Sequence, residues 1–139
     1  MYEKKRILFA GLVFHYISWG QNTIALPEII NYSKQTYKAG IQNGDICQGK
    51  NGIMYFANNE GLLSFDSTYQ NIYPLPDKTI GRSVAIATDN KIYVGGQNEI
   101  SFFTPNNLGD LEYHTLKPLI PTKNCSFSDV CNSNITKKG

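Results

Sequence analysis

The feature that most constrains this chain is an internal repeat with a spacing of about 40 residues. Residues 45–65 and 83–103 align without a gap. The alignment sets similar residues opposite one another at five positions: Ile46 with Val84, Tyr55 with Tyr93, Phe56 with Val94, Leu62 with Ile100, and Phe65 with Phe103. Because the two segments are versions of one unit, we expect them to fold in the same way.

Each copy of the unit is typical of three short strands followed by a fourth. The first three are separated by segments rich in Gly, Asn and Asp, which tolerate the positive φ of tight hairpin turns. These turn segments are residues 49–52, 58–61, 88–91 and 96–99. The fourth strand is predicted at Gln70–Tyr73 in the first copy and at Leu111–Leu116 in the second. Prolines follow both segments, and proline cannot donate to a β-ladder.

A repeat of about 40 residues made of four short strands is the pattern of a β-propeller blade. We therefore predict an all-β fold, a partial β-propeller with about two four-stranded blades and the start of a third. The expected organisation is a lead-in over residues 21–40, blade 1 over 41–78, blade 2 over 79–120, and the start of blade 3 with an irregular tail over 121–139. Phe127–Val130 resembles the opening strand of that third unit.

The number of blades has a physical consequence. A blade buries its faces only against neighbouring blades, and a closed propeller needs about four or more of them. We therefore expect a fragment or truncated product of a larger receptor. Its open strand edges favour pairing with the missing blades or self-association.

The first twenty residues have the order of a signal peptide. Basic residues at positions 4–6 precede the apolar run Ile7–Trp19, and Ser18 and Gly20 supply the small side chains of a cleavage site. This apolar run is shorter than the roughly 20 residues needed to span a bilayer. We expect export to the periplasm; the alternatives are a buried N-terminal strand or helix and an uncleaved anchor.

Charge, cysteine and histidine content exclude several classes of function. Lys and Arg number 13 against 11 Asp and Glu, and no basic run follows the N-terminal segment, so we predict no nucleic-acid binding. Cys47, Cys125 and Cys131 are too few for a disulfide scaffold; Cys125 and Cys131 either bridge a short loop or are incidental. With only His15 and His114 beside them, no metal or other cofactor is predicted.

The candidate chemical residues are expected to have structural roles. Asp45, Glu60, Asp66, Arg82 and Asp89 lie in or beside turns, where such side chains usually close the turn or face water. No paired carboxylates or Ser-His-Asp arrangement are suggested, so we predict a protein that is not an enzyme and has no catalytic residues. Four strand or turn tyrosines are able to stack on a sugar, although strand aromatics usually belong to the core: Tyr55, Tyr69, Tyr73 and Tyr93.

Three segments resemble the two-component regulator propellers of Bacteroidota-type bacteria: Pro27–Tyr32, Asn51–Asp66 and Ile92–Gly96, of which Asn51–Asp66 is the most specific. The resemblance implies a periplasmic sensor of nutrients, often oligosaccharide fragments. In that family a full-length parent is membrane-anchored and signals to a histidine kinase or a DNA-binding regulator. The expected function is therefore ligand binding rather than catalysis.

Departures from the family pattern keep two alternatives open. Gly44, Gln70 and Cys131 stand where the family tends to have large aromatics, and loss of a buried ring costs about 3–5 kcal/mol. The three-tyrosine, membrane and output segments of the family have no counterpart in these residues. The alternatives are a secreted structural or adhesive β-repeat protein and a fragment of a carbohydrate-active propeller enzyme.

Overall fold

The computed structural model describes residues 28–121 and 128–136. The chain divides into two compact units, Met1–Asn31 and Tyr32–Gly139, and the fold described below is that of the second. The predicted signal peptide, residues 1–20, and Cys125 lie outside the described residues.

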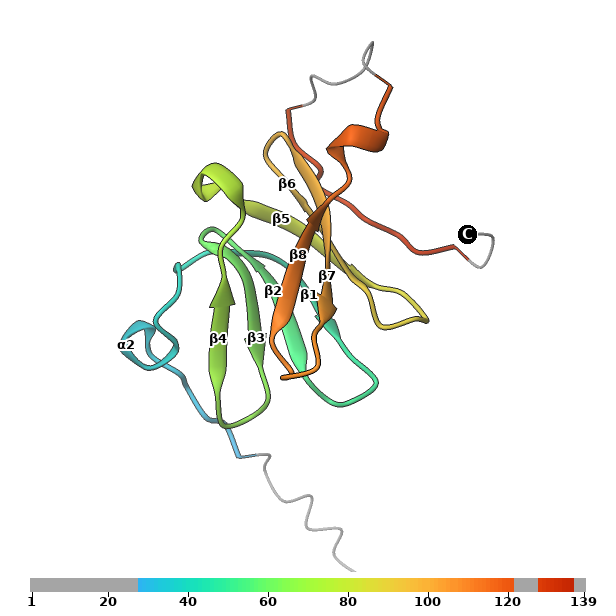
Figure 1. Cartoon of the computed structure of the whole chain (residues 1–139). Coiled ribbons are helices and arrows are strands. Elements are labelled where there is room, and N and C mark those ends of the chain that lie inside the picture. The colour runs from blue at the N-terminus through green and yellow to red at the C-terminus, as the bar shows by residue number, and fades with distance from the viewer. Residues whose placement is uncertain (1–27, 122–127, 137–139) are drawn as a thin grey trace, which may run out of the picture. The chain divides into compact units, whose positions relative to one another are not determined.

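Two antiparallel four-stranded sheets form the body of this unit (Figure 1). Sheet A has the order β1-β2-β3-β4 and sheet B the order β5-β6-β7-β8. The strands are β1 (Asn43–Gln48), β2 (Met54–Asn58), β3 (Gly61–Phe65), β4 (Gln70–Tyr73), β5 (Gly81–Ile86), β6 (Ile92–Gly96), β7 (Glu99–Pro105) and β8 (Leu111–Thr115). A short helix, α2 (Lys34–Tyr37), precedes β1, and the 3-10 turns η1 (Pro76–Lys78) and η2 (Lys117–Leu119) follow β4 and β8. The all-β prediction is confirmed, and the second predicted fourth strand ends one residue early.

The two sheets repeat each other in register as well as in order. Tyr55 pairs with Cys47 and Ser64, and Tyr93, its counterpart in the second copy, pairs with Ala85 and Phe102 at the equivalent places. Each first strand also has a register shift at the same position, between Asn43 and Asp45 in β1 and between Gly81 and Ser83 in β5. The sequence repeat is therefore a repeat of backbone geometry, down to the position of the β-bulge.

One face of sheet A packs on one face of sheet B, and β1 and β2 lie against β5. The side chains between the sheets form one buried cluster: Tyr55, Ala57, Leu62, Leu75, Val84, Ile92, Val94 and Phe103. Phe103 is 1% exposed and Leu62 is fully buried. Fully burying a side chain of this size stabilises the fold by about 1.5–3 kcal/mol. The two sheets therefore depend on each other for their core.

A hydrogen bond to a side chain of β1 connects the first strands of the two sheets, β1 and β5. The Asp45 carboxylate accepts a hydrogen bond from the backbone N–H of Val84 through Oδ2 at 3.0 Å, and from the N–H of Ile46 through Oδ1 at 2.8 Å. Beside it, Gly44 approaches the backbone of Arg82 so closely that a Cβ atom would lie 2.7 Å from the Arg82 carbonyl oxygen. An aromatic side chain at position 44 would not fit this contact, so glycine suits the approach of the two strands.

The lead-in to sheet A is held by one buried amide. Asn58 is fully buried, and its Nδ2 donates to the Gly40 carbonyl at 2.8 Å and to Asn43 Oδ1 at 2.7 Å. Its Oδ1 accepts from the N–H groups of Gly40 and Glu60, both at 3.0 Å. Satisfying these buried groups offsets the cost of removing the amide from water.

The predicted opening of a third unit contacts sheet B without forming a strand in the described residues. Phe127 lies outside them, and Asp129 makes a single bridge with Gln97. Asn98 N–H donates to the Ser128 carbonyl at 2.7 Å, and Val130 N–H donates to the Gly96 carbonyl at 3.1 Å. This extended segment therefore lies against the end of β6 and the β6–β7 turn.

Candidate functional site

A cleft of about 650 Å³ opens between the two sheets at one end of their shared core. Its walls come from the β1–β2 turn, β3 and β4 of sheet A, and from β6, the β7–β8 turn and β8 of sheet B. Clefts of this size accommodate small-molecule ligands. Residues of both sheets line the cleft, so it forms only when the two repeats pack together.

Three of the four tyrosines singled out in the sequence line this cleft. Tyr55 is 6% exposed and supplies part of the floor, Tyr73 belongs to β4, and Tyr69 is 70% exposed in the turn before it. Tyr93 points to the opposite face of sheet B, where its ring packs beside Phe102. The structure therefore gathers Tyr55, Tyr69 and Tyr73 and leaves Tyr93 apart.

Amides, aliphatic side chains and two charged side chains also line the cleft. Asn51 closes its own turn, since its Oδ1 accepts from the N–H of Ile53 at 3.2 Å. Lys50 donates through Nζ to the Thr88 carbonyl at 3.4 Å and so connects the first turns of the two sheets. Burial raises the pKa of Tyr55, opposed by the nearby Asn51 side chain, so its hydroxyl remains protonated at neutral pH.

Asp66 is the one carboxylic acid among the described residues that line the cleft. Its Oδ1 accepts from the N–H groups of Tyr69 at 2.6 Å and Thr68 at 2.9 Å. These two hydrogen bonds, led by that of Tyr69, hold the pKa of Asp66 below its usual value of 3.8. An ionised carboxylate engaged with its own turn shapes the β3–β4 loop and is unsuited to donate a proton near neutral pH.

The other residues singled out in the sequence do not join this cleft. Asp45 connects β1 to β5, as described above, and Glu60 lies in the β2–β3 turn. Asp89 pairs with Lys91 at 2.8 Å, and Arg82 Nε lies 3.7 Å from Asp129. These side chains occupy turns or strand edges, away from the three tyrosines.

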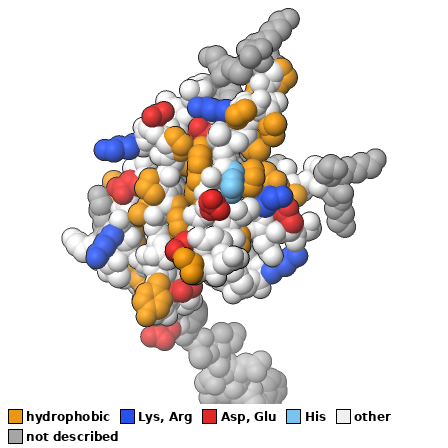
Figure 2. All heavy atoms as spheres, viewed as in Figure 1, with side chains coloured by type: hydrophobic (Ala, Val, Ile, Leu, Met, Phe, Trp, Pro, Cys, Tyr) orange, Lys and Arg blue, Asp and Glu red, His pale blue; other side chains and the backbone are white. Residues whose placement is uncertain are grey.

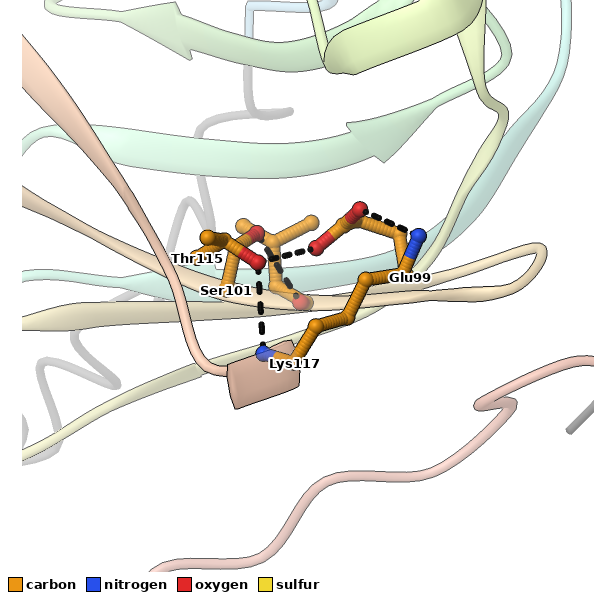
Figure 3. Close-up of polar contacts among 5 residues, drawn as sticks. Glu99, Ser101, Thr115 and Lys117 are labelled. Atoms are coloured by element: carbon orange, nitrogen blue, oxygen red, sulfur yellow. Dashed lines mark hydrogen bonds and ion pairs between the residues drawn. The ribbon is translucent and has the colours of Figure 1, made fainter. Parts of the chain in front are cut away.

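A buried polar cluster lies at the opposite end of β7 (Figure 3). The Glu99 side chain is 4% exposed, and its carboxylate accepts from Thr115 Oγ1 at 3.1 Å and pairs with Lys117 Nζ at 3.1 Å. Ser101 donates to the Val94 carbonyl at 3.4 Å. Burial raises the pKa of the nearby Tyr113 hydroxyl.

Sequence patterns carried little indication of this cluster, because Glu99 departs from the repeat. Its counterpart in sheet A is Gly61, which has φ +129° and touches the backbone of Tyr73 so closely that no side chain fits. In sheet B the same position carries an acid whose charge is matched from η2 by Lys117. The only local signal was a basic residue shortly after the fourth strand.

Within residues 28–121 and 128–136, no three His, Cys, Asp or Glu side chains gather as metal ligands would. No helix in these ranges has the length and apolar character needed to cross a bilayer. Cys47 and Cys131 are free cysteines, of which Cys131 is exposed. Searches against models of protein families, curated proteins and solved structures found no match to this chain.

The cleft combines aromatic rings and aliphatic side chains with amide groups and two charged side chains, Lys50 and Asp66. Rings present flat apolar surfaces, while amide and phenol groups donate and accept at their margins. Such a lining offers both apolar and polar contacts to a small molecule.

Proposed function

We propose that this chain is a ligand-binding module of a partial β-propeller, exported to the periplasm, and that it senses rather than transforms its ligand. In this proposal sheets A and B are two neighbouring blades of a toroidal assembly. The ligand is a neutral oligosaccharide fragment held in the cleft between them. A full-length relative would pass the signal across the membrane to a kinase or a transcriptional regulator.

The observation that carries the proposal is the convergence of Tyr55, Tyr69 and Tyr73 on one cleft of about 650 Å³. The matching registers of the two sheets support the blade interpretation, because each blade of a propeller repeats one four-stranded unit. The contact of β5 with β1 and β2 also fits two blades whose first strands lie nearest a common axis.

Calorimetric titration of the folded chain with neutral hexose and pentose oligosaccharides tests the proposal. Tyr69→Ala removes the most exposed ring of the cleft, and we expect it to weaken binding by about tenfold, or about 1.4 kcal/mol. Tyr93→Ala is the matched control, because that ring lies on the opposite face of sheet B. Its affinity should stay within about twofold of the unmodified chain.

Two results would count against this function. One is the absence of heat with every oligosaccharide, and the other is an equal loss of affinity in the Tyr69 and Tyr93 variants. Release of shorter sugars during incubation would instead favour the carbohydrate-active enzyme.

A further inference from the structure

The face of sheet B that points away from sheet A carries a row of rings. Tyr93 of β6 and Phe102 of β7 have centroids 5.7 Å apart, and His114 of β8 stacks on Phe102 at 4.9 Å with an interplanar angle of 18°. All three are partly exposed. Figure 2 shows hydrophobic side chains beside the pale blue histidine. We call this surface the outward face of sheet B.

The equivalent face of sheet A is the one that sheet B covers. Tyr55 and Leu62 are the repeat counterparts of Tyr93 and Ile100, and they are 6% and 0% exposed within the core between the sheets. Tyr93 and Ile100 keep part of their surface in solvent. The outward face of sheet B is therefore the repeat of a surface that elsewhere in the chain packs against a sheet.

The chain also has a surface that could pack on the outward face of sheet B, namely the outward face of sheet A. Val84, Val94 and Phe103 of sheet B pack on sheet A, and their counterparts on the outward face of sheet A are Ile46, Phe56 and Phe65. The outward face of sheet A has a hollow of about 250 Å³ lined mainly by aromatic and apolar side chains: Tyr32, Tyr37, Phe56, Leu63 and Phe65, with Asn43 and Gln70 at its margin. Ile46 beside it is 52% exposed.

We propose that a second copy of this chain docks head-to-tail, with the outward face of its sheet A on the outward face of sheet B. The contact brings together the same repeat positions that meet between sheets A and B, although on the outward face of sheet A the Tyr32 ring already packs on Phe65 at 5.0 Å. Because two different faces meet, the contact is heterologous, and each further copy adds in the same direction. This inference rests on the arrangement of the sheets and not on ligand binding.

Residues 128–130 cover part of the outward face of sheet B, on which the second copy would dock. Ser83 Oγ donates to the Val130 carbonyl at 2.9 Å, and Ser83 is the repeat counterpart of Asp45, which binds the backbone of Val84. Val130 therefore lies on sheet B where Val84 lies on sheet A. Docking of a second copy releases this segment, which consequently competes with that copy.

Sedimentation of the unmodified chain without ligand, over about a hundredfold range of concentration, tests the inference. We expect reversible association that is at least about tenfold weaker in Ile46→Asp and in Phe102→Asp, each of which places a charge in one docking face. Tyr93→Arg gives a second variant of the sheet B face, and circular dichroism checks that each variant is folded. Leu108→Asp is the control, since Leu108 is 88% exposed in the β7–β8 turn.

Mixing the two Asp variants distinguishes head-to-tail docking from a symmetric dimer. Each retains the face that the other has lost, so the mixture should form a one-to-one dimer that grows no further. Val130→Asp, which weakens the competing segment, should associate at least about tenfold more tightly than the unmodified chain. Monomers throughout for both the unmodified chain and Val130→Asp, or variants that fail to associate when mixed, would overturn the inference.

Discussion

Tyr55 and Tyr93 hold the same place in two sheets, yet only Tyr55 is covered by a neighbouring sheet. Each belongs to the second strand of its sheet and faces the same way relative to its own strand partners. Tyr55 is 6% exposed in the core between the sheets, whereas Tyr93 is partly exposed beside Phe102. One repeated residue thus has a structural role in sheet A and belongs to a face that no second sheet covers in sheet B.

This difference predicts unequal costs for the same substitution. Tyr55→Ala removes a buried ring and should lower the free energy of unfolding by about 3–5 kcal/mol. Tyr93→Ala removes a partly exposed ring and should lower it by about 1–2 kcal/mol. Urea unfolding of the monomeric chain measures both values. Equal losses would mean that the two tyrosines have the same surroundings.

The ion pair between the buried Glu99 and the partly exposed Lys117 predicts coupling between these two side chains. Lys117→Ala leaves the Glu99 carboxylate buried with Thr115 as its remaining partner, and solvent reaches the 40% exposed lysine. We therefore expect a loss of about 1–2 kcal/mol, below that of a fully buried pair.

Glu99→Gln tests this coupling in a double-mutant cycle with Lys117→Ala. The second substitution should cost much less when Glu99 is already neutral, because no buried charge is left unpaired. Additive losses measured by thermal unfolding would show that the two residues do not interact.

Cys47 should react slowly with alkylating reagents. Its burial, reinforced by the charge of Asp45, raises the pKa of the thiol from 9.0 to about 11. Since the thiolate is the nucleophile, its fraction at pH 8 falls about a hundredfold. In a variant with Cys125→Ser and Cys131→Ser, alkylation by iodoacetamide should be about a hundredfold faster in urea than in buffer. Similar rates in both conditions would contradict the partial burial of Cys47 and the raised pKa of its thiol.

Asp66 predicts a loss of stability in acid. Its carboxylate accepts two backbone hydrogen bonds only in the folded chain, which lowers its folded pKa below 3.8. The unfolded chain therefore binds the proton first as the pH falls. The stabilisation is fully present above the unfolded pKa and disappears as the pH falls through the folded one.

Asp66→Asn keeps an acceptor oxygen and removes the titration. Thermal unfolding from pH 6 to pH 2 should show a smaller drop in Tm for this variant than for the unmodified chain. Parallel curves would mean that Asp66 contributes nothing to the acid sensitivity.

Much of the sheet architecture could be predicted from the sequence. The internal repeat and the prolines after each unit located β4 at Gln70–Tyr73, which the structure confirms. Turn residues such as Gly52 and Asn90 do have positive φ, of 85° and 65°. These features are local, so neighbouring residues in the sequence carry the information.

The candidate site was harder to predict because it depends on contacts between the repeats. Tyr69 and Asn90 belong to different copies of the repeat, and they line the same cleft only when the two sheets pack together. Glu99 breaks the repeat, so the pattern that located the strands carried no information about its partner Lys117. Residues 128–130 make only the one bridge between Asp129 and Gln97 in the described part of the chain, where no further strand follows to complete a third sheet.

Nuclear Overhauser contacts of Tyr55 and Tyr93 test the stacking of the two repeated sheets most directly. In the monomer, the Tyr55 ring should show contacts to methyl groups of sheet B, such as those of Val84 and Ile92, which share its buried cluster. The Tyr93 ring should show contacts to Phe102 and none to sheet A. A Tyr55 ring that contacts residues of its own sheet alone would contradict the account.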